Sequence, residues 1–166
     1  VIHVIDYETK SVLKFNADKS NFTTLKNVSL NDTVPKLIST EGGSLNYLES
    51  KDYTKPIFYT KKENNMLITK LRSFGEGYIL KEPIPVIPWE IMSEYKSLSG
   101  LRCQKAIGYF RGRTYEVWFT EAIPISLGPW KLQGLPGLIL EAKDENDRCF
   151  YRATKIKLKI TSNFSF

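Results

Sequence analysis

The chain has 166 residues and a net charge of +6, with 42% hydrophobic and 13% aromatic residues. This length and apolar content fit one folded domain and exclude a disordered chain. The 24 basic residues are dispersed along the chain, which argues against the dense basic tail of a nucleic-acid-binding protein. No apolar run approaches the roughly 18 residues that a membrane-spanning helix needs.

Short runs of β-branched and aromatic residues predict the strands of the first half. Residues 16–50 are polar, so we expect a loop with weak strands there. Pro83, Pro85 and Pro88 then impose an extended path, which separates an N-terminal part (1–82) from a C-terminal part (89–160) of one β-rich domain, residues 1–166. The strands expected in the first half are 1–7, 11–15, 56–60, 66–71 and 77–81, with a polar hairpin turn at 61–65.

The C-terminal part shows clearer alternation of apolar and polar residues. This pattern predicts strands at 101–109, 114–120, 138–142 and 149–160, of which the first and the last bury one side. Only 88–96 has a helical look. The expected fold is mainly β, an antiparallel meander that forms a curved sheet or a partly open barrel, with at most one short helix near 88–96. The residues expected on the two buried sides are Leu101, Cys103, Ile107, Tyr109, Ile156, Leu158 and Ile160.

The segment 123–140 contains two turn signals around an apolar stem. Gly128-Pro129 is one signal. Pro136-Gly137 is the other, with the glycine expected at the positive-φ position of a type II turn. Trp130 and Leu135 are too apolar for an idle solvated loop. We therefore expect this segment either to fold back and plug the end of the sheet or to meet a partner.

The hexapeptide Gly-Leu-Pro-Gly-Leu-Ile at 134–139 is the motif that names the GLPGLI family, which is found in Bacteroidetes. Three other segments resemble the family's pattern in the same order: 100–106, 110–120 with its Arg-Gly-Arg turn and Trp-Phe-Thr strand, and 128–132. The similarity runs from about Trp89 to Tyr151. Leu101 departs from it, because an aromatic residue is expected there. The N-terminal third resembles the family more loosely, at 13–15 and 20–22.

The resemblance implies an exported protein of the periplasm or outer membrane, from a family of unknown function with no established catalytic residues or cofactors. Residues 1–6 do not resemble a signal peptide, so we expect the signal of an exported form to have been removed. Members of the family are suspected of working beside TonB-dependent outer-membrane transporters. The leading hypothesis is therefore a non-catalytic accessory subunit that binds an outer-membrane β-barrel transporter or another envelope protein. The alternative is a periplasmic carrier or sensor that holds an apolar ligand in a half-barrel.

The titratable residues themselves do not favour an enzyme. His3 is the only histidine, and a lone histidine without Cys, Asp or Glu at ligand spacing makes a poor metal site. It also leaves serine and cysteine nucleophiles without their usual base. We expect the carboxylates of the C-terminal part to lie on sheet surfaces opposite lysines or arginines, rather than to form an acid–base pair. These carboxylates are Glu116, Glu121, Glu141 and Asp144.

Planar cations and large aromatic rings are the residue types enriched at interface hot spots. The C-terminal part combines several of them with the family motif. The alternative reading is that the same tryptophans are core residues and the same arginines only flank a hairpin turn. The candidate partner-binding or loop-forming set is Arg111, Arg113, Trp118, Trp130, Leu135, Pro136 and Leu138.

Cys103 and Cys149 lie on predicted strands near polar turns. Because the resemblance implies an oxidising compartment, a disulfide between them would persist there. Closing that loop would add roughly 3–4 kcal/mol in the chain-entropy model. Both residues could equally be buried thiols, so the sequence leaves the pairing open.

Overall fold

The computed structural model describes residues 2–7, 11–16, 19–24, 57–61, 65–73 and 76–160. These ranges contain eleven antiparallel strands and no helix. The expected polar loop lies, from residue 25 onward, outside the described residues. The N-terminal strands are β1 (Ile2–Tyr7), β2 (Ser11–Phe15), β3 (Lys19–Thr24), β4 (Ile57–Lys61), β5 (Met66–Ser73) and β6 (Glu76–Pro83). The C-terminal strands are β7 (Trp89–Leu98), β8 (Leu101–Phe110), β9 (Arg113–Thr120), β10 (Leu138–Asp144) and β11 (Phe150–Ile160).

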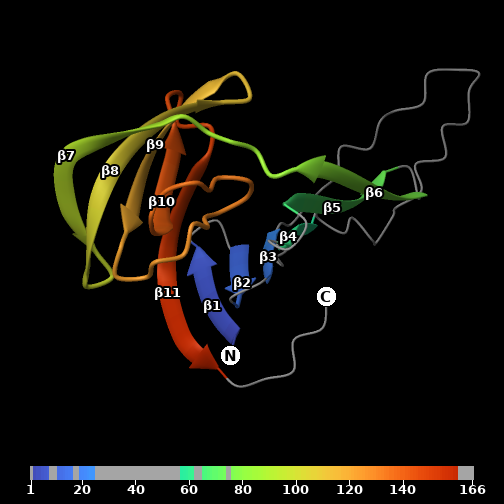
Figure 1. The fold of residues 1–166 in the computed structure, drawn as a ribbon, viewed down its shortest axis with the longest axis horizontal. Helices are drawn as coiled ribbons and strands as arrows, with labels where there is room; N and C mark the ends of the chain where they lie inside the picture. Colours follow the sequence, from blue (N-terminus) through green and yellow to red (C-terminus); the bar gives the residue numbers. More distant parts are fainter. Residues whose placement is uncertain are drawn as a thin grey trace, which may run out of the picture.

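The strands form one open sheet in the order β6-β5-β4-β3-β2-β1-β11-β10-β9-β8-β7. The long strand β11 joins the two halves, because it pairs with β1 on one side and with β10 on the other. In Figure 1, β7–β10 curve on the left, and β6 lies at the opposite end of the sheet. The expected antiparallel, curved, mainly β fold is confirmed, and the order of the described strands does not close on itself.

The segment with a helical look, 88–96, is a strand. It forms most of β7, which pairs with β8 from Trp89 opposite Gly108 to Leu98 opposite Leu101. The prolines before it favour an extended entry, and β8 supplies the hydrogen-bonding ladder. Helix propensity is a weak preference that tertiary pairing overrides.

β8 does not bury the predicted side along its whole length. Cys103 is buried as expected, but farther along the strand Ala106 and Gly108 are buried and Tyr109 is 63% exposed. The reason is that Trp89 packs directly on Gly108, where an added Cβ would lie 2.5 Å from the indole ring. The small residues of β8 therefore mark a contact with an aromatic ring, which alternation alone does not reveal.

Two hydrophobic clusters form the core, and Trp130 and Tyr151 pack against both. Because consecutive residues of β9 belong to different clusters, this strand is buried on both sides. Among the described side chains of β11, which end at Leu158 and so leave out Ile160, Ile156 is the last that packs against the core. Leu158, expected on a buried side, is therefore 47% exposed. The first cluster contains Leu13, Phe15, Phe22, Cys103, Trp118, Ile123, Leu127, Leu138, Leu140 and Ala153. The second contains Ile87, Ala106, Tyr115, Val117, Phe119, Leu132, Leu135, Ile139 and Ala142.

Candidate functional site

The loop between β9 and β10, residues 121–137 and hereafter the plug loop, folds back onto the sheet. Its base is closed by the N–H of Leu138, which donates to the carbonyl of Ile123 at 3.0 Å. The indole N–H of Trp89 donates to the carbonyl of Gln133 at 2.8 Å. Figure 1 shows the plug loop beside β10, toward β1–β3. Of the two roles expected for this segment, the structure shows the folding back.

The apolar side chains of the plug loop are part of the core. Ile123 and Leu127 join the first cluster, and Leu132 and Leu135 join the second. None of the four is more than 5% exposed. The plug loop therefore cannot offer these side chains to a partner while it stays folded against the sheet.

Gly137 of the segment 134–139 is required by close backbone packing. An added Cβ would collide with the carbonyl of Thr120 and would lie 2.9 Å from the backbone nitrogen of Glu121. The prediction that Gly137 takes the positive-φ position of a type II turn is wrong, because Gly137 does not adopt a positive φ. The positive φ angles of the plug loop belong to Trp130, at 54°, and Gly134, at 104°.

The candidate partner-binding residues do not gather on one exposed surface. Trp118, Leu135 and Leu138 are only 8%, 2% and 0% exposed. Trp130 is half-buried between the two clusters, while Pro136 is exposed. Most of this set therefore builds the core and the plug loop.

Both arginines of the candidate set form ion pairs. The Arg111 guanidinium lies 2.6 Å from the Glu82 carboxylate, and Lys131 of the plug loop donates a hydrogen bond to the same carboxylate. Arg113 donates to Asp144 at 2.9 Å. Glu82 thus connects the β6 end of the sheet to the β8–β9 turn and to the plug loop.

Asp144 organises the turn between β10 and β11. Its carboxylate is buried and accepts the backbone N–H groups of Arg148, at 2.7 Å, and Cys149, at 3.0 Å. Burial alone would raise the pKa of Asp144, but these two hydrogen bonds and the Arg113 guanidinium outweigh it and hold that pKa below its ordinary value. A carboxylate held ionised in this way is a structural anion rather than a proton donor.

Glu141 is the most enclosed carboxylate on the opposite side of β9 and β10. It is 4% exposed and pairs with Lys96 at 2.6 Å and with Arg152 at 2.7 Å. The Lys96 ammonium also lies 4.2 Å from the centre of the Trp118 ring. This cation–π contact and the ion pairs cover Trp118, which explains why this tryptophan is not available as an exposed aromatic anchor.

Glu116 on β9, like Glu141, lies close to two cations. It lies 3.3 Å from Lys105 and 3.7 Å from Lys143. Burial would raise the pKa of Glu116, but the hydrogen bond and charge of Lys105 and the charge of Lys143 lower it overall. As the sequence predicted, cations on neighbouring strands lie opposite Glu116, but Glu141 and Asp144, which also bind cations, are buried and not on an exposed sheet surface. Glu121 is exposed in the turn after β9.

The two cysteines are free thiols. Cys103 is buried on β8, and this burial raises the pKa of its thiol. His3 lies on β1 opposite Phe15 of β2, and its side chain is outside the described residues. Within the described ranges, no group of three or more His, Cys, Asp and Glu residues is arranged to hold a metal ion.

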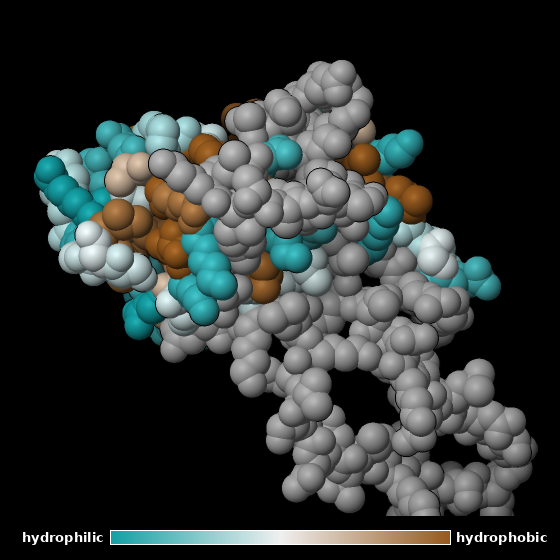
Figure 2. Space-filling model, turned by 90° about the horizontal axis from the view of Figure 1, so that it is seen from below, coloured by the Kyte–Doolittle hydropathy of each residue, from teal (hydrophilic) through white to brown (hydrophobic). Residues whose placement is uncertain are grey.

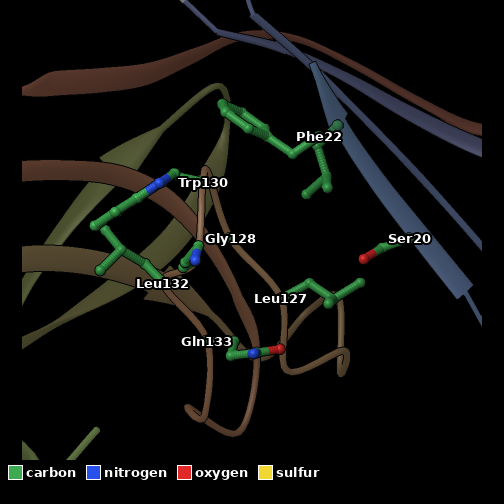
Figure 3. A pocket seen from close by; sticks show the side chains of 9 residues that line it. Ser20, Phe22, Leu127, Gly128, Trp130, Leu132 and Gln133 are labelled. Carbon is green, nitrogen blue, oxygen red and sulfur yellow. The ribbon is translucent and has the colours of Figure 1, made fainter. Parts of the chain in front are cut away.

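A small pocket lies between β3 and the plug loop. Figure 3 shows Ser20 and Phe22 on one side of it and Trp130 and Gln133 among the residues on the other. The space that a water-sized sphere can occupy is about 10 Å³, enough for one water molecule. An apolar carrier needs roughly 300–1,000 Å³, so this pocket does not favour the carrier hypothesis.

An exposed group on β7 and β8 combines an arginine with an aromatic ring. Tyr95 is 49% exposed and Ile91 is 47% exposed, and the Arg102 guanidinium lies 4.0 Å from the centre of the Tyr95 ring. The cross-strand register places all three on the same side of the two strands. We call Ile91, Tyr95 and Arg102 the β7 patch. The β7 patch was not identified from the sequence, because the pairing of 88–96 with 101–109 was not predicted. The signal of that hairpin is the turn Ser99-Gly100, in which both residues have a positive φ.

A second exposed apolar group lies on β6. Three consecutive residues, Tyr78, Ile79 and Leu80, are 46%, 62% and 53% exposed. Successive side chains of a strand point to opposite faces, so both faces of β6 carry exposed apolar surface. Figure 2 shows hydrophobic residues at the surface toward both ends of the sheet.

The comparisons with known proteins give a family of unknown function and a fold. Residues 109–141 match the family described as "Protein of unknown function (Porph_ging)". This stretch runs from the end of β8 into β10 and includes the whole plug loop. No curated protein matches the chain.

Two solved structures of the protein named PNGF-II, in space groups C2 and P21, resemble this chain with TM-scores of 0.68 and 0.64. Each is 18% identical and covers 97% of this chain, which spans only 28% of the length of that protein. At this identity the likeness shows the fold alone. No helix among the described residues is long and apolar enough to cross a membrane.

Proposed function

We propose that this chain is a non-catalytic binding module of the cell envelope, an accessory subunit that binds an outer-membrane transporter or another envelope protein. The resemblance of 134–139 and its flanking strands to the GLPGLI family supports the exported, periplasmic or outer-membrane-associated location.

The observation that carries the proposal is the β7 patch. Tyrosine and arginine are enriched among residues that dominate binding energy, and here they are stacked and exposed on the β7–β8 strand pair. Arg102 forms no ion pair with another described residue, so its charge is available to a partner. The chain also carries a net charge of +6. The fitting partner surface has an apolar hollow for Tyr95 and Ile91 and a carboxylate opposite Arg102.

The experiment is native affinity purification of the tagged chain in mild detergent. The double variant Tyr95→Ala/Arg102→Glu is expected to lose a partner that the wild type recovers, with unchanged thermal unfolding. Tyr109→Ala is the matched control, because Tyr109 is 63% exposed on the other side of the same two strands. A wild-type chain that purifies alone, or a partner that both variants retain equally, would refute the proposal.

A further inference from the structure

Among the described strands, β6 ends the sheet as a regular edge. It pairs with β5 from Met66 opposite Pro83 to Ser73 opposite Glu76 without a register shift, and no described strand pairs with its other side. A regular edge strand presents unpaired N–H and C=O groups and is a template for another strand. β6 therefore has the geometry of a strand acceptor.

The outward-facing backbone groups of β6 follow from one hydrogen bond. The N–H of Ile84 donates to the carbonyl of Asn65 at 3.0 Å, which continues the β5–β6 register by one pair. Along an antiparallel strand, residues that bond to the neighbour alternate with residues that direct their groups away from it. The residues of β6 whose N–H and C=O both face outward, away from β5, are thus Gly77, Ile79 and Lys81; Pro83 shares their parity but has no N–H.

Leu80 of β6 lies on the same face of the sheet as the buried residues of β2, β3 and β5, but it is exposed. Cross-strand neighbours run from Leu13 to Phe22, Phe58, Thr69 and Leu80. Leu13, Phe22 and Thr69 are at most 4% exposed, whereas Leu80 is 53% exposed. The face that is buried over β2, β3 and β5 is therefore uncovered where it reaches β6.

We propose that a second copy of this chain covers this edge, with the two β6 strands paired antiparallel about Ile79. The two-fold axis that relates two antiparallel strands is perpendicular to the sheet, so a given side chain points to the same face in both copies. Two residues that oppose each other must therefore both be odd-numbered or both be even-numbered. Centring the pair on Ile79 uses the outward groups of all three residues identified above. It also places Tyr78 of each copy opposite Leu80 of the other.

Charge and the position of Pro83 favour this register over one centred on Leu80. Centred on Ile79, Glu76 of one copy lies opposite Glu82 of the other, and Glu82 already holds two cations, Arg111 and Lys131. Glu76 forms no ion pair with another described residue, so in this register it adds a carboxylate near Arg111, whose side chain is 48% exposed. Centring on Leu80 would instead place Pro83, which has no N–H, opposite Gly77.

The first test is the mass of the full chain in solution across a concentration series. The wild type is expected to shift from monomer to dimer, and Ile79→Pro to weaken the dimer at least about tenfold, because it removes an outward N–H at the centre of the interface. That N–H takes no part in the β5 ladder, so the fold is expected to persist. Glu76→Lys, at an exposed position, is expected to weaken the dimer through repulsion alone. A wild type that stays monomeric, or a dimer that neither variant weakens, would overturn the inference.

The second test fixes the register by cross-linking in a Cys103→Ala/Cys149→Ala background. Directly opposed residues of a hydrogen-bonded pair have Cα atoms about 5.5 Å apart, within disulfide reach. Ile79→Cys is expected to give a covalent dimer under mild oxidation, and Tyr78→Cys and Leu80→Cys to give none. Cross-linking at 78 or 80 but not at 79 would overturn the register. The partner experiment on the β7 patch uses other residues, so either proposal can fail without the other.

Discussion

The two edge strands of the sheet, β7 and β6, differ in how their unpaired backbone edges are protected. In β7, residues 92–94 lie opposite the single residue Lys105, so the edge is interrupted by a bulge, and Glu94 forms an ion pair with Lys105 at 3.1 Å. Bulges and charged residues are the usual protection of an exposed edge. β6 has neither a bulge nor a break in its apolar centre, Tyr78 to Leu80. The comparison shows that β7 exposes side chains on an interrupted edge, whereas β6 exposes a regular backbone edge.

The packing behind the two edges differs as well. β7 packs against the core through Trp89, which contacts Gly108 and donates a hydrogen bond to the carbonyl of Gln133 in the plug loop. β6 is connected to the C-terminal part through the ion pairs of Glu82. We therefore expect substitutions at the contact of Trp89 with Gly108 and the plug loop to act on folding, and substitutions at the exposed residues of β6 to act on association.

The largest expected effect is that of Gly137→Ala, compared with Gly77→Ala on β6. The added methyl group at 137 collides with the backbone of Thr120, while nothing lies within 4 Å of the same position at Gly77. We expect Gly137→Ala to lower the free energy of unfolding by about 3 kcal/mol and Gly77→Ala to change it by less than about 1 kcal/mol. Urea unfolding measures both. Equal losses would show that the plug loop packs less tightly than its glycine implies.

Asp144→Ala is expected to lower the free energy of unfolding by about 2 kcal/mol. The substitution leaves two backbone N–H groups and Arg113 without their shared acceptor. Glu76→Ala is the matched control, since Glu76 is exposed and has no ion pair among the described residues. A loss at Glu76 as large as at Asp144 would contradict the proposed difference between the two ends of the sheet.

Acid should remove the same stabilisation. The folded-state pKa of Asp144 is lowered, so its contribution is complete above the unfolded value of about 3.9. This stabilisation is lost as the pH falls from the unfolded-state pKa towards the lower folded-state pKa, because the unfolded state takes up the proton at the higher pH. Unfolding free energies measured from neutral pH down to about pH 3 should fall less steeply in Asp144→Ala than in the wild type. Parallel curves would assign the acid sensitivity to other groups.

The alternation of residue types predicted the strands because burial in a sheet has a period of two. It predicted β2, the β4–β5 hairpin and β9–β11 within a few residues. It could not predict where a side is covered by a distant element. Gly108 is buried because Trp89 packs on it, and Leu158 is exposed although it alternates with Ile156, which packs against the core.

The candidate site shows the same limit. The motif at 134–139 and its aromatic neighbours could be recognised as unusual, and the folding back of the loop was one of two predicted roles. Hydrophobicity does not distinguish a side chain that binds a partner from one that fills the core. The β7 patch depends on cross-strand contact between Tyr95 and Arg102, which becomes visible only when the hairpin is known.

A smaller effect is expected for Glu82→Gln, which tests the connection between β6 and the C-terminal part. The amide keeps the size of the side chain but weakens its hydrogen bonds to Arg111 and Lys131. We expect a loss of about 1 kcal/mol and faster amide hydrogen exchange in β6 than in β9. Arg111→Gln, which removes only the exposed partner, should cost less. Unchanged exchange in β6 would show that other contacts hold this strand in place.

The smallest effect on folding is expected for Leu80→Thr. Leu80 is 53% exposed, and threonine is well suited to an edge strand, so the free energy of unfolding of the monomer should change by no more than about 0.5 kcal/mol. The proposed dimer should nevertheless weaken, because Leu80 packs against Tyr78 of the other copy. Ile91→Thr in the β7 patch is the control, with no expected effect on dimerisation. A loss of stability well above 1 kcal/mol for dilute Leu80→Thr would mean that the monomer itself covers this face, and β6 would then no longer be an open edge.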